Sequence, residues 1–83
     1  MKLPLYERVA LTLDLEEHGL RKGDVGVLVD YVPSSPKGGE EECLLEVFNA
    51  LGESIAVVAV RLSDIEPVRA DEVLAVRQLA KDG

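Results

Sequence analysis

Short stretches in which apolar and more polar residues alternate run through most of the chain, and they predict β-strands. The first covers residues 7–13, where Val9, Leu11 and Leu13 alternate with Arg8, Ala10 and Thr12. Successive side chains of a strand point to opposite faces, so such a stretch buries one face and leaves the other in water. Four further strands are predicted, at residues 25–32, 43–49, 54–61 and 66–68.

The predicted strand at 54–61 is apolar on both of its faces, and the one at 25–32 nearly so, which makes their orientation the hardest feature to assign. We expect the faces with Val25 and Val27, and with Ile55 and Val57, to point inward. A shift of one residue would exchange the inner and outer faces of a strand. The predicted core is Val9, Leu11, Val25, Val27, Val29, Leu45, Val47, Ile55, Val57 and Ile65.

Glycine and proline mark the connections between the predicted strands. Gly19, Gly23 and Gly26 lie around the start of the second strand, where their conformational freedom suits tight turns. One helical turn is predicted within 14–20, ended by Gly19. The other connections are a loop rich in proline and glycine, a four-residue hairpin turn and a short 3₁₀ turn, at residues 33–39, 50–53 and 62–65.

The pattern changes near the C-terminus, where it predicts an α-helix over 71–81. Asp71 is a suitable N-cap residue. Apolar residues then recur at helical spacing, which would give the helix one apolar side. They are Val73, Val76, Leu79 and Ala80.

Several short motifs, in a fixed order, resemble a small prokaryotic family known as a domain of unknown function. They are V-A-L-T at 9–12, a glycine-rich G-L-x-x-G-D-x-G segment within 19–29, L-E-V at 45–47, a turn glycine at 52, I-A-V-V at 55–58 and S-D-I-E-P at 63–67. The resemblance implies an all-β, small SH3-like barrel of about five strands. With the appended helix, we expect one domain, with the barrel at 1–69 and a C-terminal extension at 70–83.

Composition narrows the functional classes. The chain has 83 residues and a formal net charge of −7, which disfavours binding to polyanions such as nucleic acids. Its start lacks the apolar core of a signal peptide, and no stretch is long and apolar enough to span a membrane. We therefore expect a soluble cytoplasmic protein that makes no membrane contact.

Candidate chemistry is sparse. Cys43 and His18 are each the only residue of their type and lie in different segments. Zinc sites usually take four closely spaced ligands, and a cysteine nucleophile needs a base beside it. A phosphate loop would need a G-K-[ST] ending, which the glycines around Gly23 lack. We expect no catalytic residue, no metal and no cofactor, and hence no enzyme.

The favoured function is a protein-interaction module, such as a small partner or antitoxin-like inhibitory subunit of another protein. A surplus of apolar residues assigned to outer strand faces also predicts that the protein forms a homodimer or packs its C-terminal helix over its own barrel, and we favour the homodimer. The candidate partner-binding residues are Arg21, Lys22, Glu40, Glu41, Glu42, Phe48, Val58 and Val60. The first alternative is a nucleic-acid or ribosome-associated barrel of the SH3-like or KOW type, with Arg21 and Lys22 in its basic loop. A weaker alternative is an accessory domain of an enzyme.

Overall fold

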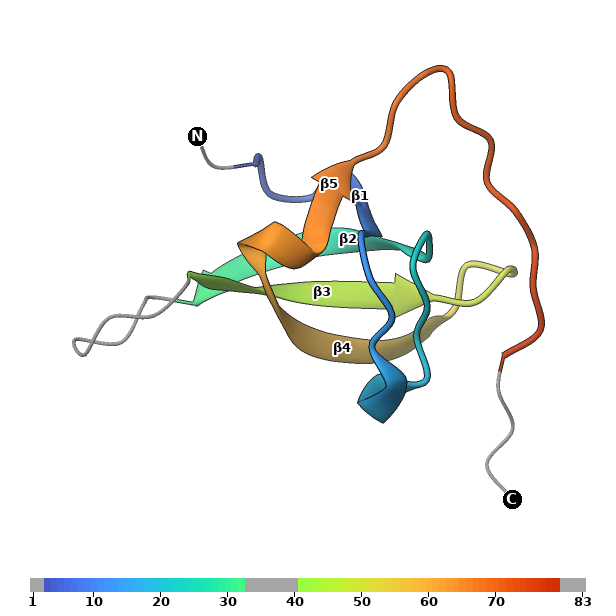
Figure 1. The fold of residues 1–83 in the computed structure, drawn as a ribbon, viewed down its shortest axis with the longest axis horizontal. Helices are drawn as coiled ribbons and strands as arrows, with labels where there is room; N and C mark the ends of the chain where they lie inside the picture. The colour runs from blue at the N-terminus through green and yellow to red at the C-terminus, as the bar shows by residue number, and fades with distance from the viewer. Residues whose placement is uncertain (1–2, 33–40, 80–83) are drawn as a thin grey trace.

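Five antiparallel strands form a single sheet in the computed structural model, which describes residues 3–32 and 41–79 (Figure 1). The strands are β1 (Arg8–Leu11), β2 (Val25–Val32), β3 (Glu42–Phe48), β4 (Ser54–Arg61) and β5 (Ile65–Pro67). Their order across the sheet is β4-β3-β2-β1-β5, so β4 and β5 are its two edges. The predicted all-β class and the number of strands are confirmed, and β2 and β4 have the predicted bounds.

Two 3₁₀ turns, η1 (Glu16–His18) and η2 (Leu62–Asp64), are the only helical elements of the described residues. Gly19 ends η1 in the left-handed conformation with φ at 69°, and its N–H bonds the carbonyl of Glu16. The buried Asp64 holds η2, because its carboxylate accepts the backbone N–H of Arg61 at 3.1 Å. Both turns lie where the sequence predicts them.

The core lies on one face of the sheet, beneath the loop that joins β1 to β2. Figure 1 shows this loop passing in front of β3 and β4. Leu20 of the loop is buried, and Leu15 packs against the same cluster. The buried apolar residues are Val9, Leu11, Leu20, Leu28, Cys43, Leu45, Val47, Val58, Val60 and Ile65.

The predicted inner faces of β2 and β4 are wrong by one residue. Leu28, Val58 and Val60, which the pattern placed outside, are buried, while Ile55 and Val57 are 41% and 56% exposed. Half of the predicted core is confirmed, namely Val9, Leu11, Leu45, Val47 and Ile65. The homodimer was predicted from a surplus of apolar residues on the outer strand faces. In the structure, Ile55 and Val57 belong to that outer set, and Leu28, Val58 and Val60 do not.

Two irregularities in strand pairing change the alternation on which the prediction depended. The register between β2 and β3 shifts between Leu28 and Asp30, so Val29 is an extra residue and Tyr31 shares a face with Leu28. A second shift, between β3 and β4, lies next to Phe48. Counting by twos across a bulge exchanges inside and outside, so a single alternation does not hold over the whole length of either strand.

Gly26 explains why β2 turns this face inward. A Cβ atom built on Gly26 would lie 2.7 Å from Cγ of Leu45 and 2.8 Å from the carbonyl oxygen of Glu46. The missing side chain thus makes room for Leu45, one of the largest fully buried residues. Gly26 was predicted to serve a turn, but its role is this close approach between strands.

The predicted C-terminal helix is absent over residues 71–79, which run as an irregular, extended segment. Val73 and Val76 of its expected apolar side are 91% and 86% exposed. A short amphipathic helix is marginal in water unless its apolar side packs on a surface, and these side chains have none. Residues 80 and 81 of the prediction lie outside the described part. Within that part, no helix has the length and apolar character needed to cross a membrane.

Candidate functional site

A tight turn at the end of the β1–β2 loop holds the carboxylate of Asp24 in a defined position. The backbone N–H of Arg21 donates to Oδ2 of Asp24 at 2.8 Å, and the N–H of Asp24 donates to the carbonyl of Arg21 at 2.9 Å. Gly23 permits the turn with φ at 93°. The carboxylate is therefore oriented by its own loop.

A second carboxylate supports the same turn. The backbone N–H of Lys22 donates to Oδ1 of Asp14 at 2.8 Å. The N–H of Gly23 donates to the carbonyl of Leu11, at the end of β1, at 2.8 Å. These bonds join the turn to the strand beneath it, so the site has a rigid base.

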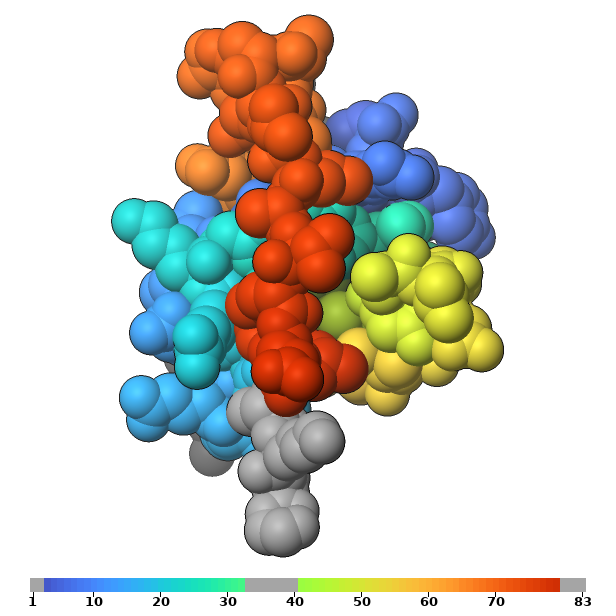
Figure 2. Space-filling model, turned by 90° about the vertical axis from the view of Figure 1, so that its right-hand side faces the viewer, coloured from blue at the N-terminus to red at the C-terminus, as the bar shows by residue number. Residues whose placement is uncertain are grey.

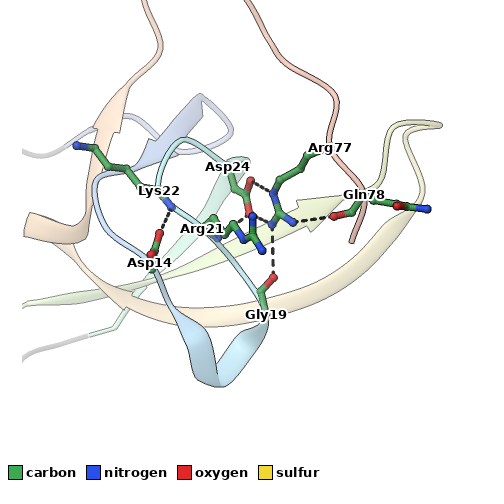
Figure 3. A network of polar contacts seen from close by, with 7 residues as sticks. All are labelled: Asp14, Gly19, Arg21, Lys22, Asp24, Arg77 and Gln78. Atoms are coloured by element: carbon green, nitrogen blue, oxygen red, sulfur yellow. Dashed lines mark hydrogen bonds and ion pairs between the residues drawn. The ribbon is translucent and has the colours of Figure 1, made fainter. Parts of the chain in front are cut away.

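Arg77 of the C-terminal segment binds this turn from 53 residues away in the sequence (Figure 3). Its Nε donates to Oδ1 of Asp24 at 2.9 Å, and one terminal nitrogen binds Oδ2 of the same carboxylate. That nitrogen also donates to the carbonyl of Gly19 at 3.4 Å. The two side chains are only 26% and 19% exposed, which makes this a partly buried bidentate pair.

The surroundings of Asp24 keep it ionised. Burial by itself would raise the pKa of its carboxyl group. The hydrogen bonds from the Arg77 side chain and the Arg21 N–H, together with the charges of both arginines, outweigh burial and leave the pKa below its usual value of 3.8. Asp24 therefore presents a carboxylate across the physiological pH range.

Figure 2 shows the C-terminal segment crossing one end of the molecule, between the β1–β2 loop and the hairpin that joins β3 to β4. Within the described residues, the Arg77 side chain contacts the β1–β2 loop at Asp24 and Gly19. Its aliphatic side chains at 73, 74, 76 and 79 remain exposed. The segment therefore lies on this surface through a polar anchor, without a buried apolar face of its own.

The predicted partner-binding residues do not form one surface. Arg21 and Lys22 are exposed on the turn described above. Glu42 and Phe48 are exposed at opposite ends of β3, and Glu41 is half-buried. Glu40 lies outside the described residues. Val58 and Val60 are in the core, so their assignment to a binding surface is wrong, for the same reason that the face of β4 was misassigned.

The sulfur of Cys43 is in the core and makes its contact with the carbonyl of Val60 at 3.7 Å. Burial, with smaller contributions from the charges of Asp64 and Glu42, raises the pKa of the thiol to about 11. The imidazole of His18 lies on η1, with Nε2 3.8 Å from Oε1 of Glu17. Across residues 3–32 and 41–79, no group of three or more potential ligands could hold a metal ion.

The contact that sequence reasoning missed is the one between Arg77 and Asp24. Arg77 falls within the predicted helix, which does not form, and Asp24 falls within the glycine-rich segment predicted to make turns. The one available signal was that Arg77 is the only basic residue within residues 70–79. No local pattern links two residues so far apart in the chain.

A comparison with protein families matches residues 5–67 to the family described as a domain of unknown function, DUF4926. The match covers the whole sheet and ends just before the C-terminal segment. Searches of curated proteins and of solved structures give no match.

Proposed function

Because the chain belongs to the DUF4926 family, whose description names no activity, we propose its function from the site itself: a non-enzymatic protein-interaction module. Its binding site is the acceptor cluster formed by the Asp24 carboxylate and the Gly19 carbonyl. Its ligand is an arginine in an extended segment of another protein, for which Arg77 of the chain's own tail substitutes. The observation that carries the proposal is the bidentate contact between Arg77 and Asp24.

The preorganisation of Asp24 supports this proposal. Its carboxylate is held by the N–H of Arg21, from the same loop, so the acceptor does not depend on the tail. Two carboxylate oxygens and a neighbouring carbonyl match the forked donors of a guanidinium group. A lysine has a point-like ammonium group and would fit this arrangement less well.

The character of the tail also supports it. A segment that was an integral part of the fold would bury its aliphatic side chains, yet Val73 and Val76 are almost fully exposed. A tail held by such a polar anchor can be displaced from the site by a competing segment. The partner would be another protein, in agreement with an antitoxin-like or inhibitory subunit.

The order of elements supports an SH3-like barrel as the scaffold of this module. A long loop separates β1 from β2, a hairpin joins β3 to β4, and a 3₁₀ turn leads from β4 into β5. In this interpretation the C-terminal segment crosses an end of the barrel where two loops flank it (Figure 2).

The test uses the full chain in three forms: the parent, Arg77→Ala and Asp24→Asn. A synthetic peptide with the sequence of residues 70–79 is titrated into each and followed by NMR chemical shifts. We expect binding to Arg77→Ala, with shifts concentrated at residues 19–24. The parent should bind more weakly because its own Arg77 competes, and Asp24→Asn should not bind.

A second peptide with lysine in place of arginine is the matched control and should bind more weakly. Selection of random extended peptides on Arg77→Ala, with Asp24→Asn for counter-selection, should then enrich arginine. Equal affinity of all three proteins for the peptide, or enrichment without arginine, would show that the tail contact is only structural.

A further inference from the structure

The guanidinium group of Arg77 meets the β1–β2 loop along one edge. That edge consists of Nε and Nη2: Nε donates to Oδ1 of Asp24 at 2.9 Å, and Nη2 binds Oδ2 of the same carboxylate. Nη1 lies on the other side, where it donates to the carbonyl of Gln78, the next residue of its own segment, at 3.1 Å (Figure 3). Nε and Nη2 therefore bind the loop, and this bond from Nη1 stays within the segment.

Nη2 binds two acceptors of the loop at once. A terminal nitrogen of a guanidinium group carries two N–H donors that point in different directions. Nη2 binds the carboxylate of Asp24, and it also donates to the carbonyl of Gly19 at 3.4 Å. A methyl group on this nitrogen would replace one of its two donors, and the gap between Nη2 and the Gly19 oxygen leaves no room for it. A methyl group on Nε would likewise replace the donor to Oδ1 of Asp24.

Both acceptors are held in place by other bonds of the loop. The carboxylate of Asp24 accepts the backbone N–H of Arg21 at 2.8 Å. The peptide group that contains the Gly19 carbonyl also contains the N–H of Leu20, which donates to the carbonyl of Leu15 at 3.1 Å. Leu20 is buried in the core. Neither acceptor can move to accommodate a substituent on the guanidinium group without disturbing these contacts.

We propose that the site recognises arginine through the edge formed by Nε and Nη2, with the Gly19 carbonyl as a specificity-determining group. This inference rests on the proposed function, because it defines which arginines the site accepts. In a free side chain the two terminal nitrogens are chemically equivalent and exchange places by rotation about the Nε–Cζ bond. An arginine with one methylated terminal nitrogen can therefore place its methyl group at Nη1 and keep the binding edge unsubstituted. The site accepts such an arginine as well as the unmodified residue.

Two other methylated arginines are excluded by the same geometry. Methylation of Nε removes the donor to Oδ1 of Asp24, whichever terminal nitrogen lies beside it. Methylation of both terminal nitrogens leaves no unsubstituted nitrogen for the position of Nη2, so the bond to the Gly19 carbonyl is lost. Methylation keeps the positive charge of the guanidinium group and blocks its hydrogen bonds. A site that only attracted charge would bind all of these forms alike, so the pattern distinguishes recognition of an edge from attraction of a charge.

The first test titrates peptides with the sequence of residues 70–79 into Arg77→Ala and follows the NMR chemical shifts. Position 77 of the peptide carries arginine, arginine methylated on one terminal nitrogen, or arginine methylated on Nε. The two methylated peptides are isomers of equal charge and serve as matched controls for each other. We expect the terminally methylated peptide to bind within about threefold of the unmodified one, and the Nε-methylated peptide to bind about tenfold more weakly. A peptide methylated on both terminal nitrogens should also bind more weakly. Equal affinity of the two isomers would overturn the proposal.

The second test reads the same edge within the full chain, so it decides the inference even if no separate peptide binds. The chain is assembled from a recombinant part and a synthetic tail that carries each of the three arginines at position 77. The NMR signal of the Leu20 N–H reports on the Gly19 carbonyl, because both belong to one peptide group. We expect this signal to match the parent in the terminally methylated chain and to move toward that of Asp24→Asn in the Nε-methylated chain.

The two tests separate the two proposals. A Leu20 signal that is the same in both methylated chains would overturn the recognition of one edge. Failure of the unmodified peptide to bind Arg77→Ala, with the expected difference between the methylated chains, would instead contradict the proposed function alone.

Discussion

At the scale of single residues, Gly26 makes room for a large side chain of the core. It faces inward between Val9 of β1 and Val47 of β3, its neighbours across the two ladders. The space that a side chain would occupy is filled by Leu45. The remaining described glycines, at 19, 23 and 52, have positive φ and open space around the Cβ position, so their roles are conformational.

Gly26→Ala should destabilise the protein by about 1–3 kcal/mol, because the added methyl group overlaps Leu45 and the Glu46 backbone. Gly26→Val should cost more than Gly26→Ala. Urea unfolding followed by circular dichroism measures both. As a comparison, Gly52→Ala should cost about 1 kcal/mol from its backbone conformation alone. An unchanged midpoint for Gly26→Ala would contradict the close approach of β2 and β3.

At the scale of elements, the C-terminal segment stands apart from the strands. The strands are held by backbone ladders and a shared core, whereas the segment is tied to the β1–β2 loop through the Arg77 guanidinium. Partly buried charge-assisted bonds of this type hold a segment only while both groups are ionised. The state of the segment therefore depends on the protonation of Asp24.

Acid should release the segment. The pKa of Asp24 is lowered in the folded protein from 3.8, so its stabilising effect is fully present above that value. It is lost as the pH falls below 3.8 and through the lowered folded pKa. NMR signals of residues 72–79 should change in this range and should already resemble the released state in Asp24→Asn at neutral pH. Tail signals that are the same in both proteins at every pH would contradict an anchor at Asp24.

At the scale of the whole molecule, the net charge of −7 acts against the alternative of a nucleic-acid-binding function. Arg21 and Lys22 are exposed, as a basic loop requires. They lie on a turn whose backbone is held by the carboxylates of Asp14 and Asp24. Phosphate groups approaching this loop would meet those acids as well as the two bases.

We expect no binding to mixed RNA or to duplex DNA, even at low salt, where nonspecific association is strongest. Fluorescence anisotropy with labelled oligonucleotides measures it. The double variant Arg21→Ala with Lys22→Ala is the comparison and should behave as the parent does. Micromolar binding by the parent that disappears in the double variant would support the nucleic-acid alternative over a protein partner.

Several features follow from the sequence because they depend on local chemistry. The bounds of β2 and β4, the left-handed Gly19 at the end of η1 and the 3₁₀ turn before β5 are all set by short-range alternation and turn residues. The family is also evident from motifs alone, since the match at 5–67 contains all of them. Each of these signals acts within a few residues, where steric preferences of the backbone dominate.

Only tertiary structure decided three features: the inner faces of β2 and β4, the extended conformation of the tail, and the contact between Arg77 and Asp24. When both faces of a strand are apolar, burial energy hardly differs between them, and the choice falls to bulges and to the space beside Gly26. The tail had helical periodicity but no surface on which to bury it. Its position is therefore set by the contact of Arg77 with Asp24, 53 residues away in the sequence. An ion pair requires proximity in space and produces no periodic pattern in the sequence, so it could not be predicted.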